Sequence, residues 1–346
     1  MKAFVLTGIK QMEMREVPSP EIKSPSDVLL KITAVGVCGS DIHYYKTGKI
    51  GSQVVKSPFR VGHECAGVVE KTGAAVKRVV PGDLVAIEPA MSCGQCDQCR
   101  SGRPHTCRQL RFLGCPGQAE GCLAEYLVMP GECCCPAGEN MSAERAALSE
   151  PLAIGFYAVK KAQPLKGANI AILGCGPIGL SVMVCARAMG AAQIFATDLI
   201  NERLKVAGNN GADWTGNPKE QNIVETIPQQ QSLLLDTVFE CCGQQEALDQ
   251  AIELLKPGGK LMVAGIPETD RVSFVIDKIR RKEICIQNIR RQCECLQPTL
   301  SLMEKGKLNA DFMITHRFGF ERTKEAFDLV AGYSDGVVKA MIDFSA

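Results

Sequence analysis

The segment NIAILGCGPIGL, residues 169–180, contains the features that decide the fold. Its first five residues are mostly apolar and typical of a buried strand, and Gly174, Gly176 and Gly179 follow in GxGxxG spacing at the start of an apolar helix. At such a strand-to-helix turn, the backbone N–H groups at the helix start can hold a pyrophosphate. A second strand, QIFATD, ends at Asp198, and a carboxylate about twenty residues after the glycines is what ribose binding requires.

The carboxylate of Asp198 favours NAD over NADP, because it would repel a 2′-phosphate, and the next residue is Leu199 rather than an arginine. The alternative is that the glycines serve only the close packing of strand and helix. Arg203 is expected either against the adenine or ribose or as an exposed helix residue. The candidate cofactor residues are Gly174, Gly176, Pro177, Ile178, Gly179, Asp198, Arg203, Gly265 and Ile266.

The texture of the sequence changes near Pro151. After it, short apolar strands alternate with helix-length segments, which indicates a parallel sheet covered on both faces. Before it, short β-runs such as DVLLKITAVG lie between Gly and Pro boundaries, which predicts an all-β region. From about Gln292 a further helix and a closing strand follow. The sequence therefore predicts an α/β protein with two domains.

The composition excludes several classes of partner. Among 346 residues, 39 Lys and Arg balance 38 Asp and Glu, so no basic excess indicates nucleic acid or an anionic membrane surface. The uncharged run of residues 168–186 is interrupted by glycines and fits a strand, turn and helix better than a membrane span. The apolar patch near the N-terminus is too short for a signal-peptide core. We therefore expect a cytoplasmic protein without nucleic acid or membrane partners.

Four cysteines lie within the fifteen residues CGQCDQCRSGRPHTC. Their spacing, C-x2-C-x2-C-x7-C, can place four thiolates around one ion at about 2.3 Å, as in a closed and therefore structural zinc site. A disulfide would need an oxidising compartment, and an iron–sulfur cluster is the remaining alternative. The four residues are Cys93, Cys96, Cys99 and Cys107.

A second possible metal site is scattered along the chain. GVCGSDIHYY supplies Cys38, Ser40 and His43, RVGHECAG supplies His63 and Glu64, and LSEPLAIG supplies Glu150. Mixed Cys, His and carboxylate ligands are typical of zinc sites that keep a position open for water or substrate. Spacing alone cannot unite these segments, and an isolated His in a β-domain is usually a structural residue.

Taken together, CGSDIHYY, GHECAG, CGQCDQCRSGRPHTC, SEPLAIG and GCGPIG…TD resemble the zinc-dependent medium-chain dehydrogenases, and within them the polyol dehydrogenases. The resemblance extends over nearly the full chain. It implies a GroES-like β-domain, residues 1–152 completed by 292–346, and a Rossmann domain, residues 153–291.

The resemblance also implies roles for the scattered residues. Cys38, His63 and Glu64 would be catalytic zinc ligands, and Glu150 would hold the zinc-bound water or replace it as a ligand. Ser40 lies two residues from Cys38 and could take the proton of the substrate hydroxyl; His43 could pass it to solvent or lie at the surface beside the cofactor ribose. The substrate-binding candidates are Tyr44, Phe112 and Arg291. Three departures from the family pattern, at Gln292, Cys122 and residues 132–135, leave the exact substrate open.

The implied reaction is hydride transfer from a secondary alcohol of a polyol such as sorbitol or xylitol to NAD, giving a ketose, with two zinc ions per chain and a homotetramer or homodimer. L-Idonate, galactitol-1-phosphate and L-threonine dehydrogenases are rivals in the same family. An anionic substrate would need cationic residues near the pocket. Lys46, Lys49, Lys56 and Arg60 could supply them, or these four side chains could instead be solvated at the surface.

A different class of protein, a nucleotide-binding redox sensor, is suggested by the 18 cysteines. Most of the cysteines outside the candidate metal sites, however, lie in apolar runs and are expected to pack as small hydrophobic residues.

Overall fold

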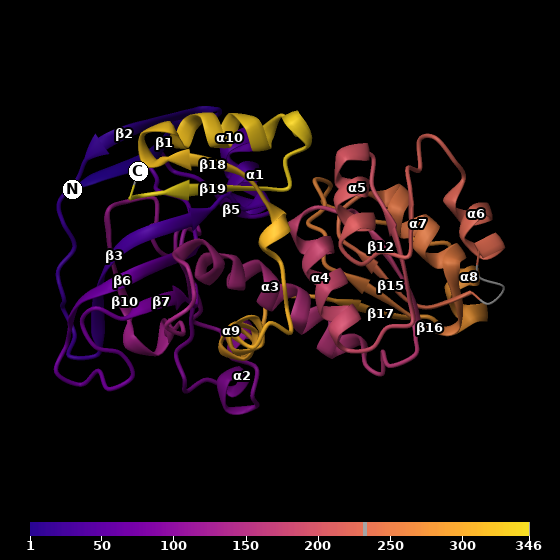
Figure 1. Ribbon diagram of the computed structural model, residues 1–346, viewed down its shortest axis with the longest axis horizontal. Coiled ribbons are helices and arrows are strands. Elements are labelled where there is room, and N and C mark those ends of the chain that lie inside the picture. Colours follow the sequence, from indigo (N-terminus) through magenta and orange to yellow (C-terminus); the bar gives the residue numbers. More distant parts are fainter. Residues whose placement is uncertain (231–233, 346) are drawn as a thin grey trace. The chain divides into compact units, whose positions relative to one another are not determined.

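The computed structural model describes residues 1–230 and 234–345. The chain divides into two compact units (Figure 1). The first contains Met1–Glu150, Leu296–Gly306 and the segment from Ile314 to the C-terminus, and the second contains Pro151–Cys295 and Lys307–Met313. Sequence reasoning placed the limits at 152/153 and 291/292 and did not anticipate that residues 307–313 join the second unit.

A seven-stranded sheet organises the first unit. Its centre is β3 (Asp27–Gly36), which pairs with β6 (Glu64–Thr72) on one side and with β19 (Lys339–Asp343) on the other, antiparallel in both cases. Alternate residues of β3 are buried, with Val28, Leu30 and Ile32 at most 1% exposed. The sheet order is β11-β7-β6-β3-β19-β18, with β10 also pairing β3. The last strand of the chain therefore completes a sheet that begins near its N-terminus.

The sheet also contains β7 (Leu84–Ile87), β10 (Tyr126–Pro130), β11 (Cys134–Pro136) and β18 (Ile314–Gly319). Three two-stranded sheets are formed by β1 (Lys2–Gly8) with β2 (Gln11–Glu16), β4 (Lys49–Ile50) with β5 (Gln53–Val54), and β8 (Ala90–Met91) with β9 (Arg111–Phe112). The helices are α1 (Gly39–Thr47), α2 (Asp97–Arg100), α9 (Leu296–Glu304) and α10 (Thr323–Ala331).

The prediction of an all-β region up to Pro151 is wrong in two places. Helix α1 lies between β3 and β4, and α3 (Ala143–Ala162) begins before Pro151 and continues through it. A proline inside a helix removes one backbone hydrogen bond and usually marks a boundary. Here the apolar face of α3 is deeply buried, with Ala146, Leu152 and Ala153 at most 1% exposed, so packing sustains the helix across the proline.

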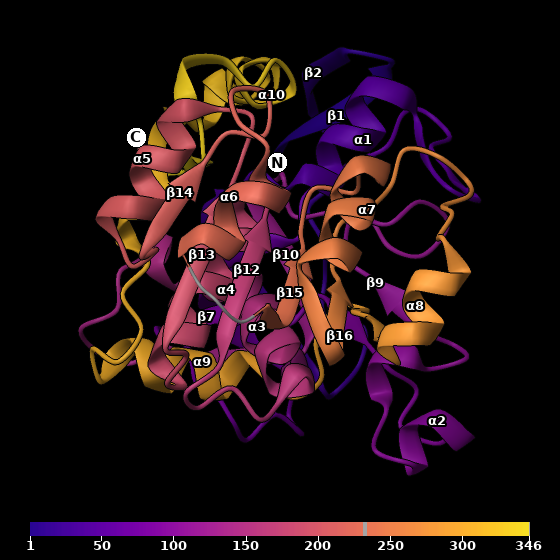
Figure 2. The ribbon, with the colours of Figure 1, turned by 90° about the vertical axis from the view of Figure 1, so that its right-hand side faces the viewer.

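The second unit is a doubly wound parallel sheet, as the alternating strands and helices predicted. Six strands lie in the order β14-β13-β12-β15-β16-β17 and all pair in parallel. Helices α4 and α5 cover one face, and α7 and α8 cover the other (Figures 1 and 2). The strands are β12 (Asn169–Leu173), β13 (Gln193–Thr197), β14 (Trp214–Gly216), β15 (Leu235–Glu240), β16 (Leu255–Val263) and β17 (Cys285–Asn288). The helices are α4 (Pro177–Ala188), α5 (Asn201–Asn209), α6 (Ile223–Gln230), α7 (Gln245–Leu254) and α8 (Ile276–Lys282).

The strand order reverses between β12 and β15, which is where such sheets bind ligands at the carboxyl ends of their strands. The turn after β12 needs its glycines: Gly174 has φ +103°, and a Cβ on Gly179 would lie 1.8 Å from the Gly174 oxygen. Pro177 occupies the first turn of α4, where its missing N–H costs nothing. The turn is thus a strand–glycine–helix junction built for close backbone approach.

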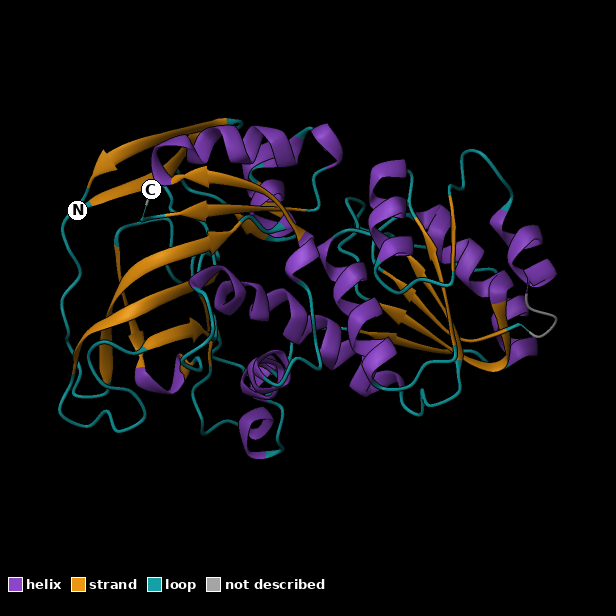
Figure 3. Ribbon diagram, in the orientation of Figure 1, coloured by secondary structure: helices purple, strands orange, loops and turns teal. Residues whose placement is uncertain are grey.

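The secondary structure differs between the units, with strands dominating the first and helices flanking strands in the second (Figure 3). Within the described residues, none of the helices has both the length and the apolar character needed to cross a bilayer.

The packing of α3 on α4 gives a test of the second unit. A Cβ on Gly155 would lie 2.5 Å from the Ser181 carbonyl carbon, so Gly155→Ala should force the helices apart and lower the free energy of unfolding by about 2 kcal/mol. Gly208, also helical, would meet only Thr215 at 3.6 Å, and Gly208→Ala should be neutral or stabilising by up to about 1 kcal/mol. Urea unfolding of both variants measures the difference. Equal effects of the two substitutions would contradict the close contact.

Candidate metal centres and cofactor site

The first unit brings together three residues from distant positions in the sequence. Ligand atoms of Cys38, His63 and Glu64 all lie within 4.8 Å of one another. Cys38 immediately precedes α1, and Glu64 begins β6 directly after His63. The register of β3 against β6 places Glu64 opposite Gly36, two residues before Cys38, so the pairing of the two strands joins the two segments. These are donors that a zinc ion accepts, and they were the ligand set expected.

A carboxylate that sequence reasoning missed orients His63. The Nδ1 atom of His63 lies 3.4 Å from Asp41 Oδ1, and both side chains are buried. Burial lowers the pKa of His63, but the charges of Asp41 and Cys38 outweigh it and raise the pKa well above its usual value. A carboxylate on one ring nitrogen fixes the ring and leaves the other nitrogen for a metal. From the sequence GSDIH alone, Asp41 can be placed about one helical turn after Cys38, but its contact with His63 cannot be inferred.

A second missed residue, Lys339, contacts the same centre from β19. Its ammonium donates to both carboxylate oxygens of Glu64, at 2.6 and 2.9 Å, and both side chains are about 1% exposed. Burial lowers the pKa of Lys339, but the attraction of Glu64 and Cys38 outweighs it, and the pKa is raised overall. The carboxylate expected to bind zinc is thus already paired with a cation.

Glu150 lies in α3 and is 6% exposed. Its pKa is raised to about 8, chiefly by burial; the charge of His63 lowers the pKa, and those of Glu64 and Glu88 contribute to the rise. A carboxyl group with this pKa carries a proton for much of the time at neutral pH. Glu150 is therefore close enough to feel the charges of the centre without belonging to the tight group of three ligand atoms. Its role as a ligand or as the holder of a water molecule stays a prediction.

Two further candidates contact the centre. The Ser40 hydroxyl lies 3.3 Å from Cys38 Sγ, and the Phe112 ring lies 5.2 Å from the His63 ring, centroid to centroid. Tyr44 is buried, and its hydroxyl donates to Gln53 at 3.0 Å and lies 3.8 Å from Cys115 Sγ. Ser40 thus lies beside Cys38, and Phe112 lies beside His63, two of the candidate metal ligands.

Two remaining candidates belong to different units. His43 is half-buried on α1. Arg291 belongs to the second unit and has φ +54°. Their expected roles, in proton transfer and in substrate binding, stay predictions.

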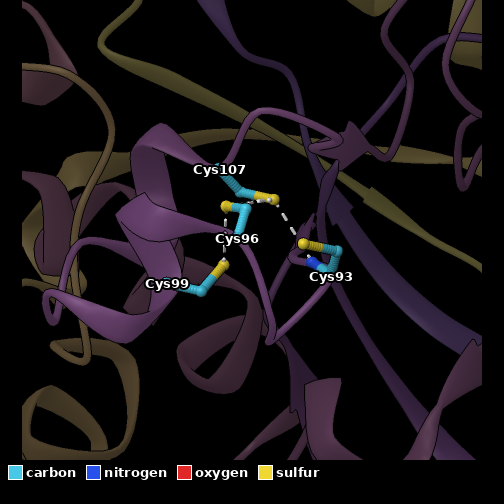
Figure 4. Close-up of side chains that lie close together, drawn as sticks. All are labelled: Cys93, Cys96, Cys99 and Cys107. Carbon is cyan, nitrogen blue, oxygen red and sulfur yellow. Dashed lines mark hydrogen bonds between the residues drawn. The ribbon is translucent and has the colours of Figure 1, made fainter.

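The four-cysteine segment forms a compact sulfur cluster (Figure 4). The sulfur of Cys96 lies 3.6 Å from that of Cys99 and 3.9 Å from that of Cys107, and all four ligand atoms lie within 4.8 Å of one another. Four thiolates about 2.3 Å from one tetrahedral ion would be about 3.8 Å apart, so the spacing fits a single ion. The four cysteines are free in this structure, which agrees with a metal site rather than with the disulfide alternative. A multi-iron cluster would hold its thiolates farther apart.

Backbone N–H groups prepare this cluster for a cation. Hydrogen bonds from the backbone of Arg108 and Cys99 lower the pKa of Cys96 to about 6, whereas burial and its sulfur neighbours raise the pKa of Cys99 to about 11. The backbone N–H of Cys93 donates to Cys107 Sγ at 3.3 Å, as does that of Gln109. Neighbouring thiolates repel one another, and a bound divalent ion removes that repulsion.

The glycine-rich turn of the second unit lies against Asp198. One oxygen of Asp198 accepts the backbone N–H of Cys175 at 2.7 Å and the other accepts that of Ile200 at 2.9 Å, so the carboxylate is fixed at the end of β13. Arg203 is only 7% exposed, and its Nη1 lies 3.7 Å from where a Cβ on Gly176 would be. The alternative of an exposed helix arginine is therefore wrong, and the guanidinium is beside the turn.

The ends of β15 and β16 complete the same edge of the sheet. Glu240, which sequence reasoning missed, is fully buried and accepts the backbone N–H groups of Cys242 at 2.8 Å and Gly243 at 2.5 Å. A Cβ on Gly265 would lie 2.2 Å from the Gly243 nitrogen, and Ile266 is 44% exposed. Glu240 thus fixes the loop that follows β15, at the point where the strand order reverses.

Comparisons with known proteins agree with this geometry. The family model "Alcohol dehydrogenase GroES-like domain" matches residues 24–139, and "Zinc-binding dehydrogenase" matches residues 177–305. Sorbitol dehydrogenase of Bacillus subtilis is 34% identical over 345 residues, covering 99% of this chain and 97% of that protein. L-Idonate 5-dehydrogenase of Vitis vinifera is 36% identical over 338 residues, covering 96% and 91%.

Solved structures share the fold as well. A protein of Sinorhizobium meliloti, assigned in its description to the zinc-binding dehydrogenases and bound to NADP, has a TM-score of 0.90 and 29% identity, with 99% of this chain and 98% of that one covered. The matches confirm the α/β class with a GroES-like domain and a Rossmann-type parallel sheet.

The sulfur cluster gives a test by metal content. Cys96→Ser replaces a thiolate of the cluster by a neutral hydroxyl, and we expect the protein to lose about one zinc ion per chain and to melt at a lower temperature. Cys285→Ser, at an exposed cysteine of β17, should change neither. Elemental analysis and thermal unfolding measure both. A Cys96→Ser protein that keeps its full zinc content would contradict a metal at this cluster.

Proposed function

The chain belongs to the zinc-dependent medium-chain dehydrogenases and is similar to their polyol dehydrogenases, and we propose that it oxidises a secondary alcohol of a polyol to a ketose with NAD. The observation that carries the proposal is the meeting of Cys38, His63 and Glu64, three zinc-binding side chains of different chemistry, in one buried group. Such a set leaves a coordination position for substrate, whereas the four-thiol cluster does not.

The reaction removes a hydride and a proton from the alcohol, giving a ketone, reduced cofactor and a proton. A zinc ion held by Cys38, His63 and Glu64 would supply Lewis-acid activation of the hydroxyl group. Asp41 keeps the His63 ring in orientation, and Phe112 packs against that ring. Ser40, at 3.3 Å from Cys38 Sγ, is placed to accept the hydroxyl proton. Glu150 and His43 are the candidates to pass it on.

The second unit would hold the cofactor. The N-terminus of α4 and the backbone of the Gly174–Gly179 turn suit a pyrophosphate, and Asp198 suits the ribose hydroxyls. The carboxylate of Asp198 would repel a 2′-phosphate and thereby favours NAD, although the similar Sinorhizobium meliloti structure is bound to NADP. Arg203 beside Gly176 is the cation that an additional phosphate could use.

Two of the four cationic residues that an anionic substrate could use are engaged elsewhere. Arg60 donates its Nε to the Gly121 oxygen at 2.6 Å, and Lys46 lies over the Tyr333 ring at 5.7 Å. This favours a neutral polyol over a polyol phosphate or a sugar acid. The 36% identity to an L-idonate dehydrogenase keeps a sugar acid as the second candidate. The intact group of Cys38, His63 and Glu64 argues against a non-enzymatic redox sensor, and a cytoplasmic homo-oligomer remains a prediction.

A substrate panel tests the proposed function. Zinc-replete protein is offered sorbitol, xylitol, L-idonate, galactitol 1-phosphate and L-threonine, each with NAD and with NADP, and reduced cofactor is followed by its near-ultraviolet absorbance. We expect the highest kcat/KM with a neutral polyol and NAD. Higher kcat/KM with L-idonate would support the second candidate, and no reduction with any of these compounds would overturn the proposal.

The catalytic metal site has its own test. Cys38→Ser should lower kcat by about a thousandfold, because Lewis-acid activation is worth several kcal/mol. The dissociation constant for NAD, measured by fluorescence titration, should stay within about twofold, since the glycine-rich turn belongs to the other unit. The matched Cys285→Ser protein should keep both values. Substantial turnover by zinc-analysed Cys38→Ser would sink this assignment.

A further inference from the structure

Lys339 is a buried lysine whose hydrogen bonds are all made to one small region. Its ammonium lies 2.6 Å from Glu64 Oε2, 2.9 Å from Glu64 Oε1 and 3.1 Å from the Val37 oxygen. An ammonium has three protons, so these three contacts use its full donor capacity. Lys339 therefore contributes to this centre both a charge and a complete set of hydrogen bonds.

The partners of Lys339 flank the candidate metal ligands. Val37 immediately precedes Cys38, and Glu64 immediately follows His63. The Val37 N–H also donates to the Ala340 oxygen at 3.0 Å, so β19 holds both backbone groups of Val37. The Glu64 carboxylate lies over Gly36, where a Cβ would be 2.4 Å from Oε2. One lysine thus links the two segments that carry the ligands.

The two cations, ammonium and metal, would share one carboxylate. Glu64 supplies an oxygen within 4.8 Å of ligand atoms of Cys38 and His63, and both of its oxygens accept from Lys339. A carboxylate buried without a partner is strongly destabilising, so in the zinc-free protein the ammonium is what makes the burial of Glu64 possible. With zinc present, ammonium and metal are like charges at short range and oppose each other.

We propose that Lys339 is a positioning residue that holds the Glu64 carboxylate in the zinc-free protein and competes with zinc for it. The inference rests on the proposed function, because it takes Cys38, His63 and Glu64 as zinc ligands. It makes Glu64 a shared ligand, whereas Cys38 and His63 are dedicated to the metal. Lys339 holds the Glu64 carboxylate in position before zinc binds. When the bond between Glu64 and zinc lengthens, the carboxylate can pair with the Lys339 ammonium again.

The test compares thermal unfolding of the full chain with and without zinc. In the zinc-free protein Lys339→Met should lower the melting temperature by about 10 °C, because it leaves a buried carboxylate without its cation. In the zinc-loaded protein the loss should be about half of that or less, because the metal becomes the partner of Glu64. The rise in melting temperature on adding zinc is therefore larger in the variant. The contribution of the four-cysteine cluster is common to both proteins and cancels.

A zinc titration against a chromophoric chelator gives a second readout. Removing a competing cation should tighten zinc binding at the group of Cys38, His63 and Glu64 by about tenfold in Lys339→Met. The control is Lys324→Met, which removes an exposed lysine 2.6 Å from Asp328 in the same unit and should change neither the zinc-induced shift nor the affinity. Equal losses of melting temperature with and without zinc would make Lys339 merely structural and overturn the proposal, as would weaker zinc binding.

The double variant Glu64→Gln/Lys339→Met guards against loss of folding. It lacks both the cation and the carboxylate, so it should fold without zinc and should not show the enlarged zinc-induced shift. If Lys339→Met alone is unfolded without zinc, recovery of folding in the double variant supports the proposal, and failure to recover overturns it. A zinc content of one ion per chain in the unmodified protein, unaffected by Cys38→Ser, would instead contradict the proposed function, which separates the two failures.

Discussion

The burial of the Glu64 carboxylate requires a cation at a fixed place, and the architecture of the first unit supplies it. Lys339 reaches Glu64 only because β19 pairs with β3 and β3 pairs with β6. An uncompensated charge in such an interior would destabilise the fold more than most apolar contacts stabilise it. The strand order of the sheet is therefore tied to the chemistry of the centre, and one cannot be changed without the other.

The two candidate metal centres use cysteine in opposite ways. The four-thiol cluster is built within one short segment, from residues whose own backbone N–H groups stabilise thiolates, and its geometry closes around a single ion. At the other centre, Cys38 stands with a histidine and a carboxylate drawn from a different strand. The first arrangement favours holding an ion permanently, and the second leaves room for chemistry at the ion.

What could be read from the sequence was local. The cysteine spacing and the GxGxxG turn with Asp198 are short-range patterns whose geometry follows from chain connectivity, and the structure has them as predicted. The prediction that Cys38 and His63 lie together depended on the family resemblance, because the spacing of residues in the sequence does not reveal which strands pair. Asp41, Glu240 and Lys339 were missed since each gains its meaning from a partner that folding brings near, and α3 was missed because Pro151 was given more weight than the packing around it.

The closing position of β19 has a consequence for biosynthesis. The doubly wound unit is contained almost entirely in one continuous stretch, so it can fold as soon as that stretch leaves the ribosome. The first unit is begun earlier in the sequence but lacks β19, one of the pairing partners of its central strand, and its buried lysine until residues 339–343 are made. Until then, the part of β3 that pairs with β19 has no partner on that edge, while some 300 residues are synthesised at roughly 5–20 residues per second. In the order of synthesis, the domain that is started first is finished last.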